Sequence, residues 1–272
     1  MLRLLVALAA VVAAAALAGS AAADPTLVPL CPGESVTSPG VALSGIVPGN
    51  LTISGNNYVD NGANLTVKGN LTLAPGACLD AFSMGTVQVG GNVLVRQGAI
   101  LGLGCATDAA LPPSPCTGST DDTVGGNIVA DNAMTMYLTA LWVGGNVISN
   151  GGGPGLGLPF VNFPIKDSVI GGNLIVQGWQ GGWFGALRNT VHGNLIYSKN
   201  ESVLDPDAAE VGTNTVLGNL ICQGNSPAVQ FGDSGAAPNV VHGNAIGQCG
   251  FDVFMPDPGY DGGGSQPISV KG

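Results

Sequence analysis

The chain has 272 residues, of which 45 are glycine and 18 are proline, and its formal net charge is −10. Only 7 residues are lysine or arginine, which disfavours nucleic-acid binding because such proteins need a basic surface to neutralise phosphates. The glycine content disfavours a helical domain, since each glycine inside a helix costs roughly 1 kcal/mol. Hydrophobic residues make up 45% of the chain, so it should fold rather than stay disordered.

Residues 1–23 have the pattern of a signal peptide. Arg3 precedes an apolar run at residues 4–18, which is shorter than the ~20 residues of a membrane-spanning helix. Residues 21–23 are all alanine, which matches the small-residue signal for cleavage. We therefore expect a chain that begins near Asp24 and is secreted to the extracellular space, without a transmembrane anchor.

An asparagine-centred repeat follows and extends as far as residue 250. Nine Gly-Asn pairs recur every 19 to 35 residues, and a β-branched residue stands three positions before each asparagine. Position +1 is apolar in every repeat and position +3 in most of them, and a spacing of two is typical of one face of a strand. The nine asparagines are Asn50, Asn70, Asn92, Asn127, Asn146, Asn173, Asn194, Asn219 and Asn244.

Repeats of this length with strand chemistry predict a solenoid in which each repeat forms one coil. We expect an all-β, single-stranded parallel β-helix of about nine to ten coils over residues 46–250, right-handed by the general preference of parallel crossovers. Residues 24–45 should form an N-terminal cap, because an uncapped end exposes sheet edges. Insertions should interrupt the solenoid near residues 100–122 and 150–168, and residues 251–272 should form a flexible tail.

The Gly-Asn pairs should turn the chain at a corner of every coil. Both residue types tolerate the positive φ that a tight bend requires. Stacked asparagine side chains can also hydrogen-bond to one another along the solenoid. We therefore interpret the nine asparagines as a structural ladder and not as a binding site.

All six cysteines lie after the predicted signal peptide, as expected for a disulfide-bonded protein of an oxidising compartment. Six cysteines allow 15 pairings, of which we favour the pairing of neighbours along the sequence. The spacing of cysteines and histidines does not match a zinc site, and we expect no metal and no cofactor. The predicted pairs are Cys31–Cys78, Cys105–Cys116 and Cys222–Cys249.

The repeat resembles a family of secreted bacterial proteins, common in actinobacteria, that carry the pattern V-x-G-N-[LV]-x-V. The similarity spans about residues 40–250 and is most specific at the end, in residues 214–228 and 239–249. The middle of the chain also resembles other β-solenoids, including bactofilin-like polymers. The resemblance implies the fold, an extracellular location and the pair Cys222–Cys249, but no established activity. Ala245 departs from the pattern, since the family often has lysine there.

A column of aliphatic residues is predicted on the outer surface, two positions after each asparagine. The first two repeats have Thr52 and Thr72 there, and the next seven have aliphatic residues. An exposed apolar stripe usually marks a contact surface. Three interpretations are open: the insertions or tail cover the stripe, a partner or a second copy binds it, or these residues face inward. This aliphatic stripe consists of Leu94, Val129, Ile148, Ile175, Ile196, Ile221 and Ile246.

Candidate catalytic residues are sparse. Asp121 and Asp122 are the only adjacent pair of acids, and we expect them in a solvated loop or turn. His192 and His242 occupy equivalent positions two coils apart, at roughly 10 Å, which is too far to bind one ion. Pectinase-like β-helix enzymes need clustered carboxylates with arginine or lysine, and we therefore expect no catalytic activity.

Two further groups of residues leave alternatives open. Asp205, Asp207 and Glu210 could hold calcium, but they lack the fuller acidic loop of known sites. A set of aromatic residues could stack on sugar rings or could simply cover the solenoid wall. The aromatic set comprises Trp142, Trp179, Trp183 and Phe184.

These observations favour a secreted, non-catalytic structural or interaction module of the cell exterior. Its partner would be a second copy, an extracellular protein or a glycan. The alternatives are a carbohydrate-binding protein and a degenerate polysaccharide-active β-helix enzyme.

Overall fold

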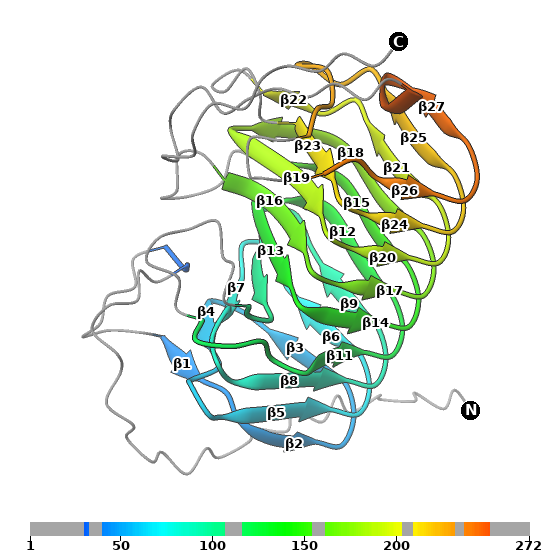
Figure 1. Cartoon of the computed structure of the whole chain (residues 1–272). Coiled ribbons are helices and arrows are strands. Elements are labelled where there is room, and N and C mark those ends of the chain that lie inside the picture. The colour runs from blue at the N-terminus through cyan, green and yellow to red at the C-terminus, as the bar shows by residue number, and fades with distance from the viewer. Residues whose placement is uncertain are drawn as a thin grey trace, which may run out of the picture.

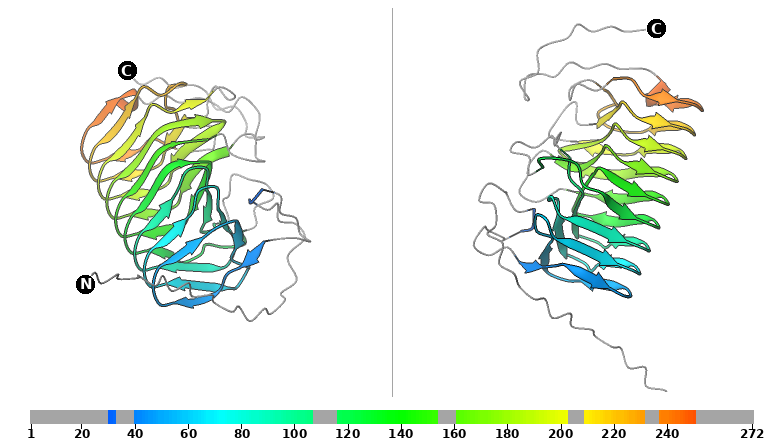
Figure 2. Two further views of the ribbon diagram at one scale, coloured as in Figure 1. Left: turned by 180° about the vertical axis from the view of Figure 1, so that it is seen from behind. Right: turned by 60° about the horizontal axis from the view of Figure 1, so that its bottom comes forward.

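The computed structural model describes residues 30–32, 40–106, 116–153, 161–202, 209–231 and 237–250, with the backbone alone at 161–164. The chain winds into a stack of coils, seen from three directions in Figures 1 and 2. The coils build three parallel sheets, and the predicted all-β parallel solenoid is confirmed. The described residues contain no α-helix, and therefore no helix that could span a membrane, but a single 3-10 turn at Gln248–Gly250.

Each sheet takes one strand from successive coils. Sheet 1 contains β1 (Val41–Ala42), β4 (Asn56–Tyr58), β7 (Cys78–Ala81), β10 (Ile100–Leu103), β13 (Thr135–Thr139), β16 (Val161–Lys166), β19 (Trp183–Leu187) and β23 (Ala209–Gly212). Sheet 2, which faces the viewer in Figure 1, contains β2 (Gly45–Val47), β5 (Asn64–Val67), β8 (Thr86–Val89), β11 (Asp122–Val124), β14 (Leu141–Val143), β17 (Val169–Ile170), β20 (Thr190–Val191), β24 (Thr215–Val216) and β26 (Val240–Val241). Sheet 3 contains β3 (Leu51–Ile53), β6 (Leu71–Leu73), β9 (Val93–Val95), β12 (Ile128–Ala133), β15 (Val147–Gly152), β18 (Leu174–Gly181), β21 (Leu195–Ser198), β25 (Leu220–Gln223) and β27 (Ala245–Gly247), while β22 (Glu201–Ser202) pairs with β18.

The described chain forms about eight coils, slightly fewer than the nine to ten predicted. The first eight coils have a strand in each sheet, whereas the ninth contributes only β26 and β27. The Gly-Asn corners lie between sheets 2 and 3, so the ninth corner at Asn244 is followed by one strand and the 3-10 turn. Counting corners therefore overestimates complete coils by one.

The apolar positions of the repeat face inward. In the second coil, Val67, Leu71 and Leu73 are completely buried, and the equivalent residues of later coils join them in one core that runs along the solenoid. Strand residues alternate between the two faces of a sheet, so the position between Leu71 and Leu73 faces outward. The inward and outward sides of sheet 3 are those expected from the sequence.

The Gly-Asn asparagines form the predicted ladder. The Oδ1 atom of each of the first eight asparagines accepts a hydrogen bond from the backbone N–H of the asparagine in the next coil, at 2.7 to 2.9 Å. The side-chain amide repeats most of these contacts, as between Asn146 and Asn127 at 3.0 Å. The ladder satisfies backbone donors that the corners would otherwise leave unpaired.

The glycine of each Gly-Asn pair has a different role from the one expected. Neither it nor the asparagine has a positive φ, so the expectation of a left-handed bend at this corner is wrong. Instead, a Cβ on Gly145 would lie 2.5 Å from Oδ1 of Asn127 and 2.8 Å from the carbonyl oxygen of Gly126. The ladder needs glycine because the preceding asparagine occupies the space of a side chain.

Positive φ is found at the other two corners. Between sheets 3 and 1 it occurs at Gly178 and Lys199, and between sheets 1 and 2 at Asp167 and Arg188. An asparagine or serine follows three of these residues and belongs to a further ladder.

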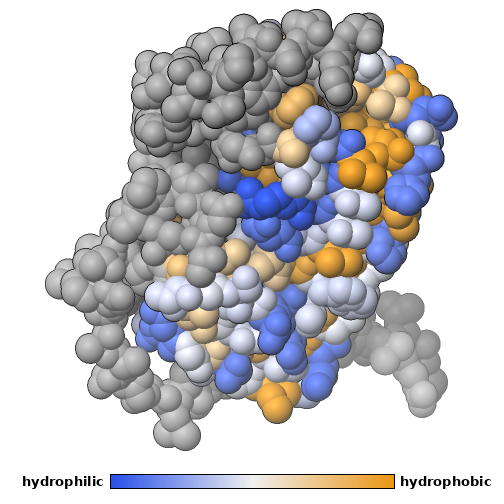
Figure 3. Space-filling model, viewed as in Figure 1, coloured by the Kyte–Doolittle hydropathy of each residue, from blue (hydrophilic) through white to orange (hydrophobic). Residues whose placement is uncertain are grey.

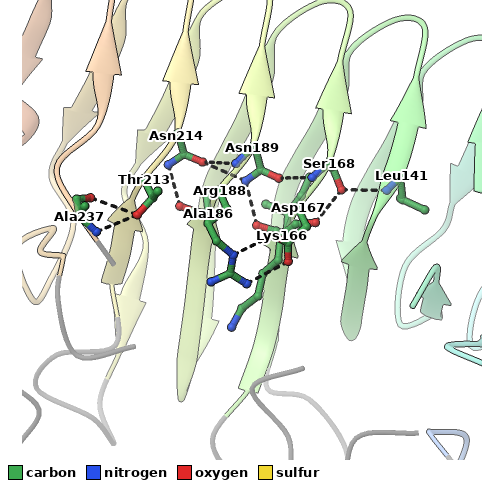
Figure 4. A network of polar contacts seen from close by, with 11 residues as sticks. Leu141, Lys166, Asp167, Ser168, Ala186, Arg188, Asn189, Thr213, Asn214 and Ala237 are labelled. Atoms are coloured by element: carbon green, nitrogen blue, oxygen red, sulfur yellow. Dashed lines mark hydrogen bonds and ion pairs between the residues drawn. The ribbon is translucent and has the colours of Figure 1, made fainter. Parts of the chain in front are cut away.

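Two shorter ladders at these corners were not predicted. Figure 4 shows one of them, in which the backbone N–H of Asn189 donates to Oδ1 of Asn214 at 3.0 Å. The direction is opposite to that of the long ladder, because here the acceptor lies in the following coil. The sequence signal was a spacing of 25 residues from Asn189 to Asn214, from Asn214 to Asn239 and from Asn200 to Asn225. The ladders comprise Ser168, Asn189, Asn214 and Asn239 between sheets 1 and 2, and Asn200, Asn225 and Gln248 between sheets 3 and 1.

The first coil has a residue suited to a sheet edge. In later coils, the residue two positions before the ladder asparagine donates its N–H to the preceding coil, as Lys68 does to the carbonyl of Val47 at 2.9 Å. The first coil has Pro48 at this position, and proline has no N–H to leave unpaired.

The three expected disulfides are present: Cys31–Cys78, Cys105–Cys116 and Cys222–Cys249. The first holds residues 30–32 beside sheet 1, where the N–H of Leu30 donates to Oδ2 of Asp80 at 2.9 Å. Oxidised cysteines are compatible with an extracellular location.

Several expected boundaries change or lie outside the described residues. The solenoid begins before residue 46, because β1 and β2 are strands of the first coil. The expected insertions are narrower than 100–122 and 150–168, since β10, β11, β15 and β16 occupy their flanks. The signal peptide, most of the cap and the tail at 251–272 lie outside the described residues.

Candidate interaction surface

The aliphatic stripe lies in a straight line on the outer face of sheet 3. Strand pairing places its seven residues opposite one another in consecutive coils. The residues on both sides of each stripe position are buried from β9 to β25, whereas the stripe residues are partly exposed. The interpretation in which these side chains face inward is therefore wrong.

A polar column runs parallel to the stripe on the same face. It lies two residues further along each strand and comprises Asp131, Asn150, Gln177, Ser198 and Gln223 in register. The Nε2 atom of Gln177 donates to Oδ1 of Asn150 at 2.8 Å. The outer face of sheet 3 is thus amphipathic, with an apolar column between polar side chains and the asparagine corner.

The outer face of sheet 2 has a different chemistry. Its outward column reads Ile46, Thr66, Gln88, Thr123, Trp142, Val169, Thr190, Thr215 and Val240. Seen from this side, apolar patches are separated by polar surface (Figure 3). Trp142 is 50% exposed and Val169 is 37% exposed.

The structure separates the aromatic residues singled out by the sequence. Trp179 and Phe184 are completely buried in the solenoid core, where Nε1 of Trp179 donates to Oγ of Ser149 at 2.9 Å. Trp183 is 8% exposed and packs with Tyr137 on the outer side of sheet 1. Only Trp142, among these four, presents its ring to solvent.

The outer side of sheet 1 is buried over its central coils. Tyr137 and Leu187 are almost fully buried, and Nζ of the buried Lys166 lies 4.9 Å from the centre of the Trp183 ring. This side was not recognised as buried from the sequence, because its outward positions carry polar and charged residues as well as aromatic ones.

The structure describes both histidines and one of the three calcium candidates. His192 and His242 are exposed and lie two coils apart, as expected. Glu210 is completely buried, while Asp205 and Asp207 lie outside the described residues. The described part of the chain contains no group of three or more histidine, cysteine or acidic residues placed to hold a metal ion.

Asp122 is not in a solvated loop, contrary to the sequence-based expectation. It begins β11, where pairing with Leu141 turns its side chain inward, and it is 1% exposed. Its Oδ1 atom accepts a hydrogen bond from the N–H of Val87, whereas Oδ2 has no hydrogen-bond partner among the described residues. Burial raises the pKa of Asp122 to about 6, against the opposing effect of hydrogen bonds from Thr120 and Val87.

The raised pKa of Asp122 predicts a pH-dependent stability. The unfolded chain releases this proton near pH 3.8 and the folded chain near pH 6, so the free energy of unfolding should fall as pH rises through this window. The unfolding temperature of the parent, followed by circular dichroism, should therefore fall between pH 3.8 and pH 6. In Asp122→Asn this fall in unfolding temperature should be smaller by about 5 °C. Part of the pH dependence should remain in this variant, because burial also raises the pKa of Asp80.

The exposed neighbour Asp121 is the matched control. The charge of Asp121 also raises the pKa of Asp122, but it is the smallest of the four causes. Asp121→Asn should therefore keep nearly the parental dependence of unfolding temperature on pH. The same dependence of unfolding temperature on pH in the parent and in Asp122→Asn would contradict the assignment of this effect to Asp122.

Comparisons with protein-family models, with curated proteins and with solved structures found no match to this chain. The functional conclusions therefore rest on the chemistry of its surfaces.

Proposed function

We propose that the protein is secreted and acts outside the cell as a non-catalytic structural or interaction module. The three disulfides support an oxidising compartment. The predicted signal peptide and the resemblance to secreted Gly-Asn repeat proteins support export. We also place the chain with those actinobacterial proteins as part of this proposal.

The titratable residues support a non-catalytic role. The acid pair is divided between an exposed Asp121 and a buried Asp122. Another acid of the outer surface, Asp167, is held in an ion pair with Arg188.

We propose further that two copies associate side by side through the aliphatic stripe. The observation that carries this proposal is the alignment of seven aliphatic side chains on one outer face. A second copy has the same spacing of ~4.8 Å between coils, so its stripe can match the first coil by coil across a two-fold axis. No other partner is guaranteed to share this period.

The size of the stripe sets the expected affinity. Seven coils give a length of ~30 Å, and with a width of roughly 10 Å the stripe covers about 300 Å², against about 800 Å² per partner in a standard interface. The polar column must therefore contribute, and the association should be weak.

Light scattering over a range of concentrations tests this proposal. The parent should increase in mass with concentration, and the double variant Ile175→Ser, Ile196→Ser should remain monomeric because it places hydroxyls at the centre of the stripe. Val169→Ser, which alters an exposed aliphatic residue on sheet 2, should behave like the parent. A parent that stays monomeric throughout, or an assembly that survives the double variant, would exclude the stripe as the interface.

A further inference from the structure

We infer that sheet 2 carries a second, independent site, at which Trp142 binds a neutral oligosaccharide through its exposed ring. This inference does not depend on association through the aliphatic stripe, which lies on another face. It assigns to one residue a role that the sequence left open among four aromatic residues.

The first step is the position of the ring. A Cβ built on Gly144 would lie 3.0 Å from Cη2 of Trp142, so the far end of the indole lies over the glycine two residues further along the chain. The ring is therefore laid along the sheet surface and does not stand away from it. Since Trp142 is 50% exposed, one broad side of the ring faces solvent.

The second step is the open space around the ring. Gly125 and Gly171 lie in the coils directly below and above Gly144 at the same corner. Because these glycines have no side chains, neither position places a side chain beside the indole. A Cβ on Gly144 or Gly171 would lie 2.5 Å from a carbonyl oxygen of the preceding coil, so the close stacking of the coils keeps this part of the corner bare.

The third step is the polar surroundings. Thr123 lies beside Trp142 in the neighbouring coil. On its other side, Val169 lies in register with Trp142, and Thr190 follows in the next coil. The two-pronged ion pair of Asp167 and Arg188, at 2.6 and 2.9 Å (Figure 4), lies at the corner between sheets 1 and 2, at the end of the strands opposite to Gly144. Both side chains are about a quarter exposed. The hydroxyls of Thr123 and Thr190 are thus the groups of the same column that can donate and accept hydrogen bonds near the ring.

This combination fits a sugar better than a protein. The face of an indole carries partial negative charge, which attracts the weakly positive C–H groups on the flat side of a pyranose, while the hydroxyls at its rim need donors and acceptors. A protein partner would require about 800 Å² of complementary surface, whereas Trp142 and Val169 stand among threonines and glycines. The net charge of −10 disfavours anionic polysaccharides, so the ligand should be neutral.

Titration with cello- and chito-oligosaccharides tests the inference. Trp179 is completely buried and Trp183 nearly so, so the change in tryptophan fluorescence on binding should come from Trp142, and calorimetry gives the affinity. Trp142→Ala should weaken binding about tenfold or more, while Trp142→Phe, which keeps a flat ring, should lose less. Val240→Ala, on the same sheet but four coils away, should bind like the parent.

Three results would overturn the inference: a parent that binds neither neutral probe, undiminished binding by Trp142→Ala, or a preference for polygalacturonate over both neutral probes. Because Trp142 is exposed, the variants should keep the parental circular dichroism spectrum and unfolding temperature. The stripe variant Ile175→Ser, Ile196→Ser should retain full sugar binding, which separates this inference from the proposed side-by-side association.

Discussion

Replacing Gly145 by alanine should lower the free energy of unfolding by about 3 kcal/mol, the upper part of the range for overpacked sites. The new Cβ would lie 2.5 Å from Oδ1 of Asn127 and 2.8 Å from the carbonyl oxygen of Gly126. Moving Oδ1 of Asn127 would break the hydrogen bonds that it accepts from Asn146 at 2.8 and 3.0 Å. Moving the carbonyl oxygen of Gly126 would break the hydrogen bond that it accepts from the N–H of Gly145 at 2.8 Å. Urea unfolding followed by circular dichroism measures the effect.

The first coil supplies a matched control for this substitution. Gly49 occupies the same position of the repeat, but no coil precedes it, and a Cβ there would have nothing within 4 Å. Gly49→Ala should therefore be neutral or slightly stabilising, because alanine restricts the unfolded chain more than glycine does. If both variants lose the same stability, the repeat requires glycine for its backbone conformation and not because of contact with the asparagine of the preceding coil.

Removing the disulfide between Cys31 and Cys78 should cost about 4 kcal/mol, the largest loss among the three disulfides. A cross-link stabilises by restricting the unfolded chain, and the restriction grows with the length of the closed loop. The separations are 47 residues for Cys31–Cys78, 27 for Cys222–Cys249 and 11 for Cys105–Cys116. The corresponding losses are about 4, about 3.5 and about 3 kcal/mol.

Paired cysteine-to-alanine variants, unfolded in urea without reductant, test this order. The variant lacking the Cys105–Cys116 disulfide serves as the control, because this disulfide closes the shortest of the three loops. The Cys31–Cys78 variant should also release residues 30–32 from sheet 1, where Nδ2 of Asn56 donates to the carbonyl of Pro32 at 2.7 Å. A reversed order of stability losses would show that native-state contacts, rather than loop length, govern the effect.

The two proposed surfaces depend on the same property of a parallel solenoid. Each outward position recurs in register at every coil, so a residue type repeated in the sequence becomes a column on the surface. Sheet 3 repeats aliphatic residues and forms a stripe. The outward column of sheet 2 has threonine in four coils, with Trp142 and Val169 at its centre and Ile46 and Val240 at its ends. The two faces can therefore be tested by separate variants.

Most of the fold could be predicted because its main signals are local. The alternation of apolar residues around each Gly-Asn pair distinguishes the inner from the outer side of a strand within five residues. Its recurrence at intervals of 19 to 35 residues indicates stacked coils. The predicted signal peptide and an even number of cysteines made disulfides between neighbouring cysteines a reasonable expectation, and the structure contains them.

The sequence by itself thus determined the solenoid, its long asparagine ladder and the aliphatic stripe. Only the tertiary structure decided why glycine precedes each asparagine, which tryptophan is exposed and that Asp122 is buried. These features depend on atoms in neighbouring coils, such as Oδ1 of Asn127 beside Gly145. Residues in contact across coils are separated by about 20 or more positions, and a local pattern does not specify which side chains approach at that distance.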